Sequence, residues 1–116
     1  MRRTLLLALA TACVLLATGA VSAANAAGLM IIHHRVADYA KWRPVFDGDR
    51  ANLQAAGLTN GRVYRSTDDA NDITIVLDMA DAAKAKAYAQ SDTLRQKMTT
   101  AGVMDKPEVL FLDPAP

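Results

Sequence analysis

The sequence predicts an α+β domain with the element order β-α-β-β-α-β. Three observations support this order: runs of β-branched and apolar residues typical of strands, helical segments that begin at aspartate or serine caps, and one strand whose alternation separates a wholly apolar face from a mixed one. The order is that of the ferredoxin-like split unit, in which a four-stranded antiparallel sheet carries two helices on one face.

The N-terminal segment, residues 1–26, is expected to be a secretory signal peptide. It has a charged start at residues 1–3, a nearly continuous apolar run at residues 5–16, and a small-x-small cleavage pattern at residues 24–26. The apolar run is shorter than the roughly 20 residues that a membrane span needs. We therefore expect cleavage after Ala26 and a periplasmic or secreted protein without a membrane span, with an uncleaved anchor as the weaker alternative.

The domain itself is expected at residues 27–113, followed by a disordered tail at residues 114–116. Of 13 basic side chains, cleavage removes Arg2 and Arg3, which leaves 11 against 12 acidic ones, and it also removes Cys13, the only cysteine. The near-neutral charge argues against a nucleic-acid partner or an anionic membrane surface. The loss of cysteine excludes disulfides, a thiolate nucleophile and cysteine-ligated metals. So small a domain depends on its hydrophobic core, which favours oligomerisation.

The first predicted strand and helix contain both histidines and half of the six Phe, Trp and Tyr residues. Residues 29–36 are apolar on both parities, which indicates a strand covered on both faces. Asp38 is a good N-cap for a helix that runs towards Ala56, and Gly57 suits the position after its last turn. Pro44 lies too deep for the first turn, so we expect it to kink the helix or to restart it after a 3₁₀ turn.

A hairpin is expected next. Residues 60–61 form a turn, residues 62–66 a second strand, residues 67–71 a solvated loop, and residues 72–79 a third strand. The remaining elements are a helix at residues 82–90 capped by Asp81, a break and second cap at residues 91–92, a short helix at residues 93–100 that ends at Gly102, and a last strand at residues 109–112.

The alternation of the third strand indicates what covers each face of the sheet. One parity is wholly apolar and suits the helices, and the other is mixed: Ile73, Ile75, Leu77 and Met79 against Thr74, Val76 and Asp78. The first and last strands are apolar on both parities, so the second sheet face also needs a cover. We therefore predict a homodimer whose two sheets pack face to face or close a shared barrel around a cavity at that face.

Several short motifs carry a family resemblance. They are His34-x-Val36-x-Asp38-Tyr39-x-x-Trp42 with Phe46-Asp47 a turn later, Arg62-Val63-Tyr64-Arg65 with the loop Asp68-Asp69-x-Asn71, and Ala101-Gly102-Val103 before Pro107-x-Val109-x-Phe111. This pattern resembles the small bacterial dimeric α+β barrel proteins of the cyclase-like and antibiotic-biosynthesis-monooxygenase-like group. The resemblance covers essentially the whole chain after residue 26.

The resemblance implies the fold and the dimer more strongly than a reaction, because that group includes cofactor-free monooxygenases, haem degraders, isomerases and ligand-binding modules. The Asn, Trp and His triad of the haem-degrading members has no counterpart here, since the first strand supplies no Asn and no His lies on a predicted helix. We expect no cofactor.

His33 and His34 are the first candidates for a functional site. Neighbours on a strand point to opposite faces, so the two cannot bind one metal ion within a chain, and we expect no metal site. One of them is expected to line the cavity as a hydrogen-bonding or proton-transfer group, a buried structural histidine being the alternative. Parity groups His33 with Arg35 on the more polar face and favours His33. The resemblance favours His34, which we rank first.

The aromatic side chains are candidates for ligand contact. Trp42 and Phe46 lie four residues apart on the predicted helix, where they form either core or cavity wall. Tyr39 and Tyr64 each have a hydroxyl that suits a ligand oxygen, a surface position being the plainer interpretation.

Charged side chains complete the candidates. Arg65 and Arg62 alternate on one strand, so only one faces the cavity, where it would pair with an anionic or phenolic ligand. Asp78 lies among apolar residues on the face assigned to the cavity, and an unpaired carboxylate there is costly. Asp78 is therefore the best candidate for a general base, together with His34. The alternative is a strand-end residue in water.

Three hypotheses about function follow. The sequence contains no phosphate-binding glycine motif, no nucleophile elbow and no dinucleotide fingerprint. The first hypothesis is a module that binds a small hydrophobic or aromatic molecule outside the cytoplasm. The second, which rests mainly on the resemblance, is a cofactor-independent monooxygenase, cyclase or isomerase acting on a phenolic or polyketide-like substrate. The third is a structural module that only dimerises.

Overall fold

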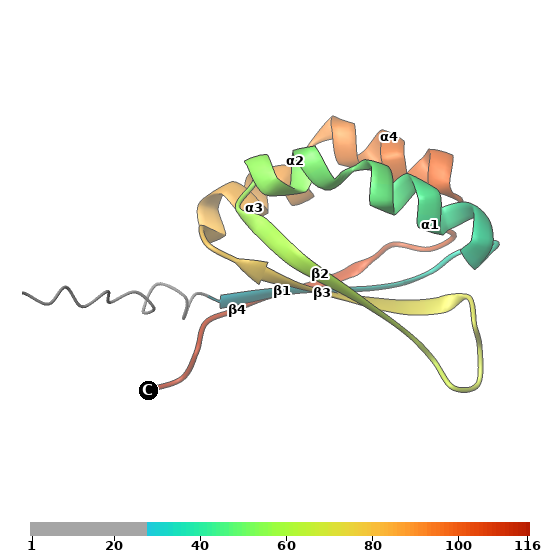
Figure 1. Ribbon diagram of the computed structural model, residues 1–116, viewed down its shortest axis with the longest axis horizontal. Helices are drawn as coiled ribbons and strands as arrows, with labels where there is room; N and C mark the ends of the chain where they lie inside the picture. Colours follow the sequence, from blue (N-terminus) through green and yellow to red (C-terminus); the bar gives the residue numbers. More distant parts are fainter. Residues whose placement is uncertain (1–27) are drawn as a thin grey trace, which may run out of the picture.

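The computed structural model describes residues 28–116, so the predicted signal peptide and its cleavage position lie outside the described residues. The described residues form one sheet with all helices on the same side of it (Figure 1). In chain order the elements are β1 (Gly28–Arg35), α1 (Tyr39–Gly48), α2 (Arg50–Ala55), β2 (Leu58–Arg65), β3 (Asp72–Met79), α3 (Ala82–Ala89), α4 (Asp92–Ala101) and β4 (Glu108–Leu112). None of the helices within these residues is both long and apolar enough to cross a membrane.

The four strands pair in the order β2-β3-β1-β4, and every pair is antiparallel. The central strand β1 pairs with β3 from Gly28–Met79 to Arg35–Asp72, and with β4 from Leu29–Leu112 to His33–Glu108. The two strands of the hairpin, β2 and β3, lie next to each other, with β2 at one edge of the sheet. This topology confirms the predicted ferredoxin-like α+β fold, with each of its two helices divided in two.

The core lies between the sheet and the helices. As the alternation predicted, Ile73, Ile75, Leu77 and Met79 face the helices, and none of these side chains is more than 3% exposed. From β1, Met30 and Ile32 pack on the same side, and Trp42 of α1 is 3% exposed. Burial of large apolar side chains stabilises the fold by about 1.5–3 kcal/mol each.

The first helix breaks at a different place from the one predicted. Asp38 caps α1 as expected, since its side chain accepts a hydrogen bond from the Ala40 amide at 2.9 Å. Pro44, however, lies inside α1, so the predicted restart of the helix there is wrong, and the alternative of a kink at Pro44 stays a prediction. The helix ends instead at Gly48 and restarts after Asp49, two residues with poor helix propensity, and the Asp49 amide closes the turn onto the Phe46 carbonyl.

The second strand begins earlier than predicted. Asn60 and Gly61 are not a turn before the strand but an irregularity within β2, where the pairing with β3 shifts between Thr59 and Arg62. Asn60 has φ 53°, which asparagine tolerates better than most residues. A Cβ at Gly61 would lie 3.2 Å from Leu77 and 3.3 Å from Phe46, so glycine lets the strand approach the core.

The C-terminal helices follow the predicted caps. Asp81 accepts a hydrogen bond from the Lys84 amide and Ser91 accepts one from the Leu94 amide, each at 3.1 Å. Gly102 follows α4 with φ 83°, the left-handed conformation that ends many helices.

The other side of the sheet, which we call the outer face, has no helix over it (Figure 1). Val76, Ile31 and Leu110 lie side by side across β3, β1 and β4 on this face. Leu110 is 53% exposed, and Leu112, two residues further along β4 on the same face, is 40% exposed. The single chain therefore leaves an apolar strip of sheet in contact with water.

Candidate functional site

The described residues line a cavity of about 340 Å³ between the helices and the sheet, which is partly open to solvent. Its walls are mainly apolar and come from both layers: Met30, Ile32, Ile75, Val109 and Phe111 from the sheet, and Trp42, Val45, Phe46, Leu53, Leu94, Met98 and Ala101 from the helices. The sequence predicted a cavity on the outer face, between two sheets. This cavity lies on the opposite side of the sheet and within one chain, whereas the predicted cavity between two sheets needs a second chain and stays a prediction.

His34 is the histidine that lines this cavity. It is 3% exposed, and the edge of its ring meets Trp42 with 6.0 Å between ring centroids and 70° between planes. Its Nδ1 atom is buried and has no hydrogen-bond partner among the described residues. Burial lowers the pKa of His34, so the imidazole is neutral at neutral pH. A neutral, unpartnered imidazole can accept a proton from a molecule in the cavity.

The aromatic wall of the cavity comes from α1. Trp42 and Phe46, one helical turn apart, stack with 5.0 Å between centroids and 14° between planes, and both line the cavity. Flat stacked rings of this kind suit a planar ligand. Trp42 is also the only tryptophan of the chain.

Asp49 is a second polar group at the cavity and was not among the candidates predicted from the sequence. Asp49 is 5% exposed and accepts hydrogen bonds from the Tyr88 hydroxyl and, at 2.7 Å, from the Asn52 side chain. Lys97 Nζ lies 3.4 Å from Asp49 Oδ1. Burial and Asp49 together raise the pKa of Tyr88, which stays protonated. Asp49, Tyr88 and Lys97, which all line the cavity, form what we call the Asp49 cluster.

Only part of this cluster had a signal in the sequence. Asp49 follows Trp42 by seven residues and Phe46 by three, which places a carboxylate on the aromatic face of the helix. Tyr88 and Lys97 come from α3 and α4, and no pattern along the chain links them to Asp49.

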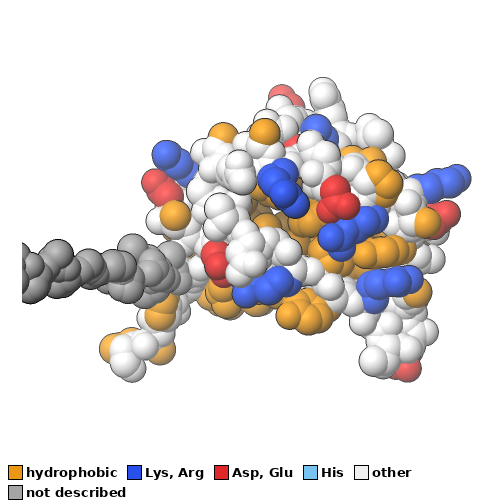
Figure 2. All heavy atoms as spheres, in the orientation of Figure 1, with side chains coloured by type: hydrophobic (Ala, Val, Ile, Leu, Met, Phe, Trp, Pro, Cys, Tyr) orange, Lys and Arg blue, Asp and Glu red, His pale blue; other side chains and the backbone are white. Residues whose placement is uncertain are grey.

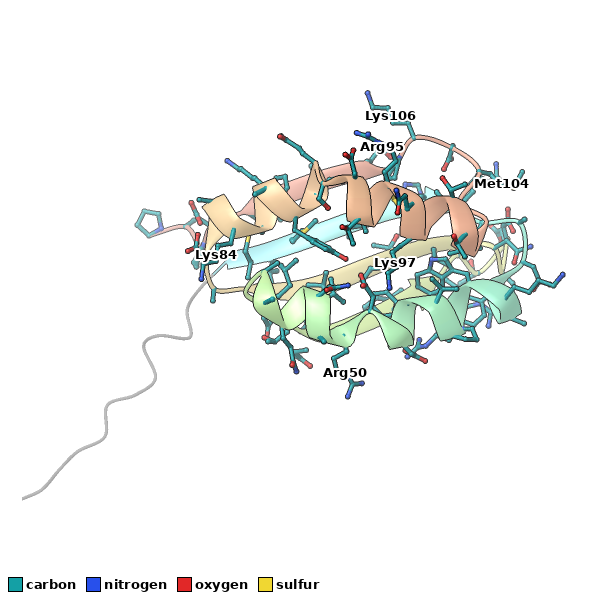
Figure 3. All side chains as sticks on the ribbon, turned by 90° about the horizontal axis from the view of Figure 1, so that it is seen from above. Arg50, Lys84, Arg95, Lys97, Met104 and Lys106 are labelled. Carbon is teal, nitrogen blue, oxygen red and sulfur yellow. The ribbon has the colours of Figure 1, made fainter. Side chains whose placement is uncertain are left out.

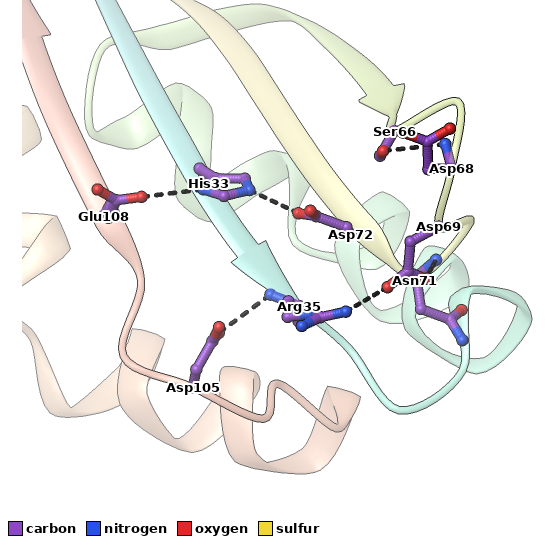
Figure 4. Close-up of polar contacts among 9 residues, drawn as sticks. All are labelled: His33, Arg35, Ser66, Asp68, Asp69, Asn71, Asp72, Asp105 and Glu108. Carbon is purple, nitrogen blue, oxygen red and sulfur yellow. Dashed lines mark hydrogen bonds and ion pairs between the residues drawn. The ribbon is translucent and has the colours of Figure 1, made fainter.

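His33 lies on the outer face, away from the cavity. Its Nδ1 is 3.0 Å from Glu108 Oε1 and its Nε2 is 2.5 Å from Asp72 Oδ1 (Figure 4). Carboxylates only accept hydrogen bonds, so both contacts require the doubly protonated ring. Glu108 and then Asp72 raise the pKa of His33 accordingly. Within residues 28–116, no three His, Cys, Asp or Glu side chains are grouped so that they could hold a metal ion.

Asp78 and Tyr64 also lie on the outer face. Asp78 accepts hydrogen bonds from Arg62 Nη2 at 2.9 Å and from Asn60 Nδ2 at 3.1 Å, and its side chain is 46% exposed. Tyr64 is paired with Thr74 and is 58% exposed. Strand alternation puts Asp78 on the opposite face from Leu77 and Met79, so the structure does not bring this carboxylate to the cavity.

Tyr39 and Arg65 pack against each other outside the cavity lining. The Arg65 guanidinium lies 4.0 Å from the centroid of the Tyr39 ring, and the Tyr39 hydroxyl accepts a hydrogen bond from Arg43 at 3.2 Å. Of the residues singled out from the sequence, the structure therefore gathers His34, Trp42 and Phe46 around the cavity. It places the others elsewhere: His33, Tyr39, Tyr64, Arg65 and Asp78.

A second hollow of about 350 Å³ lies between α1–α2 and β2. Its lining is more polar and includes Arg43 and Arg50. On the face shown in Figure 2, basic side chains lie around hollows in which hydrophobic side chains are visible. Phe46 and Leu53 line both hollows and so form the wall between them.

Comparisons with known proteins find similarity in structure only. No model of a known protein family matches the chain. No curated protein matches it either.

Among solved structures, a protein from Bordetella bronchiseptica described as an antibiotic biosynthesis monooxygenase superposes on this chain with a TM-score of 0.64. The two share 16% sequence identity, and the match covers 77% of this chain and 97% of that one. SnoaB, a cofactor-independent oxygenase from Streptomyces nogalater, gives 0.58 at 13% identity, over 76% and 94%. A Streptomyces coelicolor monooxygenase from the gene ActVA-Orf6, in complex with nanaomycin D, gives 0.55 at 15% identity, over 79% and 90%. The chain therefore has the ferredoxin-like α+β fold of the antibiotic biosynthesis monooxygenases, the group that its sequence motifs resemble.

Proposed function

We propose that the protein is a cofactor-independent oxygenase that acts on a small phenolic aromatic molecule in the helix–sheet cavity. The observation that carries the proposal is the buried His34, whose Nδ1 has no partner within the described residues and whose ring meets Trp42. A polar atom in such a position costs free energy unless something binds it, so a ligand hydroxyl is the natural partner.

The size and lining of the cavity support an aromatic ligand. A volume of about 340 Å³ falls within the range of roughly 300–1,000 Å³ for small-molecule sites. The stacked rings of Trp42 and Phe46 offer a flat wall, and the sheet side contributes aliphatic residues. A bicyclic phenol fits this environment, with its hydroxyl directed to His34.

The chemistry needs only the substrate, molecular oxygen and a base. Neutral His34 takes the phenolic proton, and the electron-rich phenolate reduces O₂. One oxygen atom forms a bond to the ring carbon opposite the hydroxyl, the hydrogen of that carbon is lost, and the other oxygen atom leaves as water. One phenol and one O₂ thus give one quinone and one water. The mainly apolar walls of the cavity exclude part of the solvent from the reaction.

The structural neighbours support this proposal over simple binding. One neighbour is a cofactor-independent oxygenase, and another is a monooxygenase in complex with nanaomycin D. The second candidate, a module that binds an aromatic molecule without turnover, draws on the same mainly apolar cavity. It differs from the first only in the absence of oxygen consumption.

The experiment uses 1-naphthol as a probe, with an oxygen electrode and the absorbance of the quinone product. We expect oxygen uptake whose rate rises with pH through the lowered pKa of His34, because only the neutral ring accepts a proton. His34→Gln should reduce turnover by roughly 100-fold, the lower end of the contribution of a general base. His33→Gln, on the other face of the sheet, is the matched control and should leave turnover unchanged.

Two results would contradict the proposal. Binding of 1-naphthol, detected by quenching of Trp42 fluorescence, without oxygen uptake would favour the binding module. Equal turnover in the wild type and in His34→Gln would show that His34 is not the base in the reaction.

We further propose that the protein is exported and that it forms a homodimer through the outer face. The charged start, apolar run and small-residue cleavage pattern of residues 1–26 support export. The exposed Leu110 and Leu112 and the apolar strip beside them support the dimer, since association would bury them.

A further inference from the structure

Lys97 places a positive charge at the cavity. It lies on α4 among Leu94, Met98 and Ala101, which line the cavity with it. Viewed from above the helices, Lys97 lies between α4 and the α1–α2 pair, whereas Lys106, which also contributes to the lining, points away from the molecule (Figure 3). The Lys97 side chain is 37% exposed, so it lies at the mouth of the cavity.

The contact with Asp49 orients Lys97 but leaves it able to bind a ligand. Asp49 already accepts two hydrogen bonds, from Tyr88 and Asn52. The 3.4 Å between Lys97 Nζ and Asp49 Oδ1 exceeds the roughly 2.7–2.9 Å of a charge-assisted hydrogen bond. The ammonium group has three donors, and Asp49 engages it mainly through charge.

His34, the polar side chain that the proposed mechanism uses, is neutral. His34 has a lowered pKa, so an anionic group on a ligand gains little at that position. The Asp49 carboxylate oxygens already accept hydrogen bonds from the Tyr88 hydroxyl and the Asn52 amide, and a carboxylate offers no donor to an anion. The ammonium of Lys97 is therefore the part of the cavity that attracts an anion.

We propose that Lys97 binds a carboxylate of the ligand at the mouth of the cavity, and that Asp49 is the positioning residue for Lys97. This inference rests on the proposed function and narrows its substrate class to hydroxyaromatic carboxylates. A carboxylate is ionised at neutral pH, and pairing it with an ammonium in a partly dehydrated position favours such ligands over neutral phenols.

The test compares two probes by isothermal titration calorimetry: 1-naphthol and 5-hydroxy-1-naphthoate, which differ only by the carboxylate. The wild type should bind the naphthoate more tightly. Lys97→Met keeps most of the side-chain stem and should weaken the naphthoate by about tenfold, the size of one hydrogen bond to a charged group, while naphthol changes less than about twofold. Lys97→Arg should restore the preference. Lys84→Met, an exposed lysine on α3 outside the cavity lining, is the control for charge removal.

The outcomes separate this inference from the proposed function. Equal weakening of both probes by Lys97→Met would mean that Lys97 only supports the fold, and no weakening of either would mean that it only covers apolar surface; both results overturn the inference. Binding of both probes without preference for the naphthoate also overturns it, while the cavity remains a binding site. Binding of neither probe would overturn the proposed function and this inference together. A carboxylate preference without oxygen uptake would support Lys97 and contradict the oxygenase alone.

Discussion

Two adjacent histidines on β1 have opposite electrostatic environments. His34 faces the helices, where burial lowers its pKa, and His33 faces outward between Glu108 and Asp72, which raise its pKa. The difference comes from strand alternation alone, because neighbouring side chains enter different layers of the molecule. One residue is suited to accept a proton, and the other holds one.

His33 should stabilise the protein only while it is protonated. Its folded-state pKa lies above the ordinary 6.5, so its contribution is complete below pH 6.5 and is lost as the pH rises through the folded value. We expect His33→Gln to lower the free energy of unfolding more at pH 5.5 than at pH 9, by less than about 1 kcal/mol because solvent screens this partly exposed site. Urea denaturation of both proteins at the two pH values measures the difference. A pH-independent loss would contradict the doubly protonated ring.

At the scale of the elements, the ends of the helices lie next to residues of the candidate site. The break between α1 and α2 occurs at Asp49, which lies three residues after Phe46 and lines the cavity with it. Gly102 ends α4 in the left-handed conformation and accepts a hydrogen bond on its carbonyl from the Ala37 amide. The end of α4 is thereby joined to the segment that leads into α1.

Two glycines should respond to alanine in opposite directions. Gly102→Ala forces a Cβ into a conformation with φ 83°, which costs about 1–2 kcal/mol, although the space itself is open enough. Gly48→Ala meets no atom within 4 Å and replaces glycine near the end of α1, so it should stabilise by up to about 1 kcal/mol. Urea unfolding of the two variants provides the comparison. Destabilisation by both would show that the α1–α2 break depends on Gly48.

At the scale of the whole molecule, the sequence predicted the fold well, because each strand and cap depends on local pattern. The apolar parity of β3 and the capping residues Asp38 and Ser91 were correct for this reason. The break at Asp49 and the bulge at Asn60 were not predicted: Gly48 and Asp49 weaken a helix without marking where it ends, and the register shift in β2 depends on its pairing with β3.

The candidate site was less predictable than the fold. The resemblance ranked His34 first, whereas the parity of β1 favoured His33. The pattern of β1 could not decide between them, because this strand is apolar on both faces. Asp78 lies on the face predicted for it, and the cavity within the single chain lies on the other face, so a role for Asp78 between two sheets stays a prediction. The Asp49 cluster joins three elements, and such a meeting of side chains is a property of helix packing that no local pattern contains.

The proposed dimer predicts the effect of a charge on the outer face. Leu110 is 53% exposed, so Leu110→Lys should leave the fold of a single chain intact and dissociate the dimer. Sedimentation velocity measures the mass, and circular dichroism verifies the fold. Met104→Lys is the control, since Met104 is 69% exposed but lies in the segment between α4 and β4. A wild-type monomer, or a dimer that survives Leu110→Lys, would contradict association through this face.

The bulge at Asn60 also bears on aggregation. β2 is an edge strand, and an unbroken edge is a template on which strands of other chains add and begin a fibril. The shift between Thr59 and Arg62 interrupts the regular row of amides and carbonyls, and the other edge, β4, is only five residues long and begins with a charged side chain, Glu108. Neither edge offers a long flat template, so the sheet resists growth into a continuous ribbon even at high protein concentration.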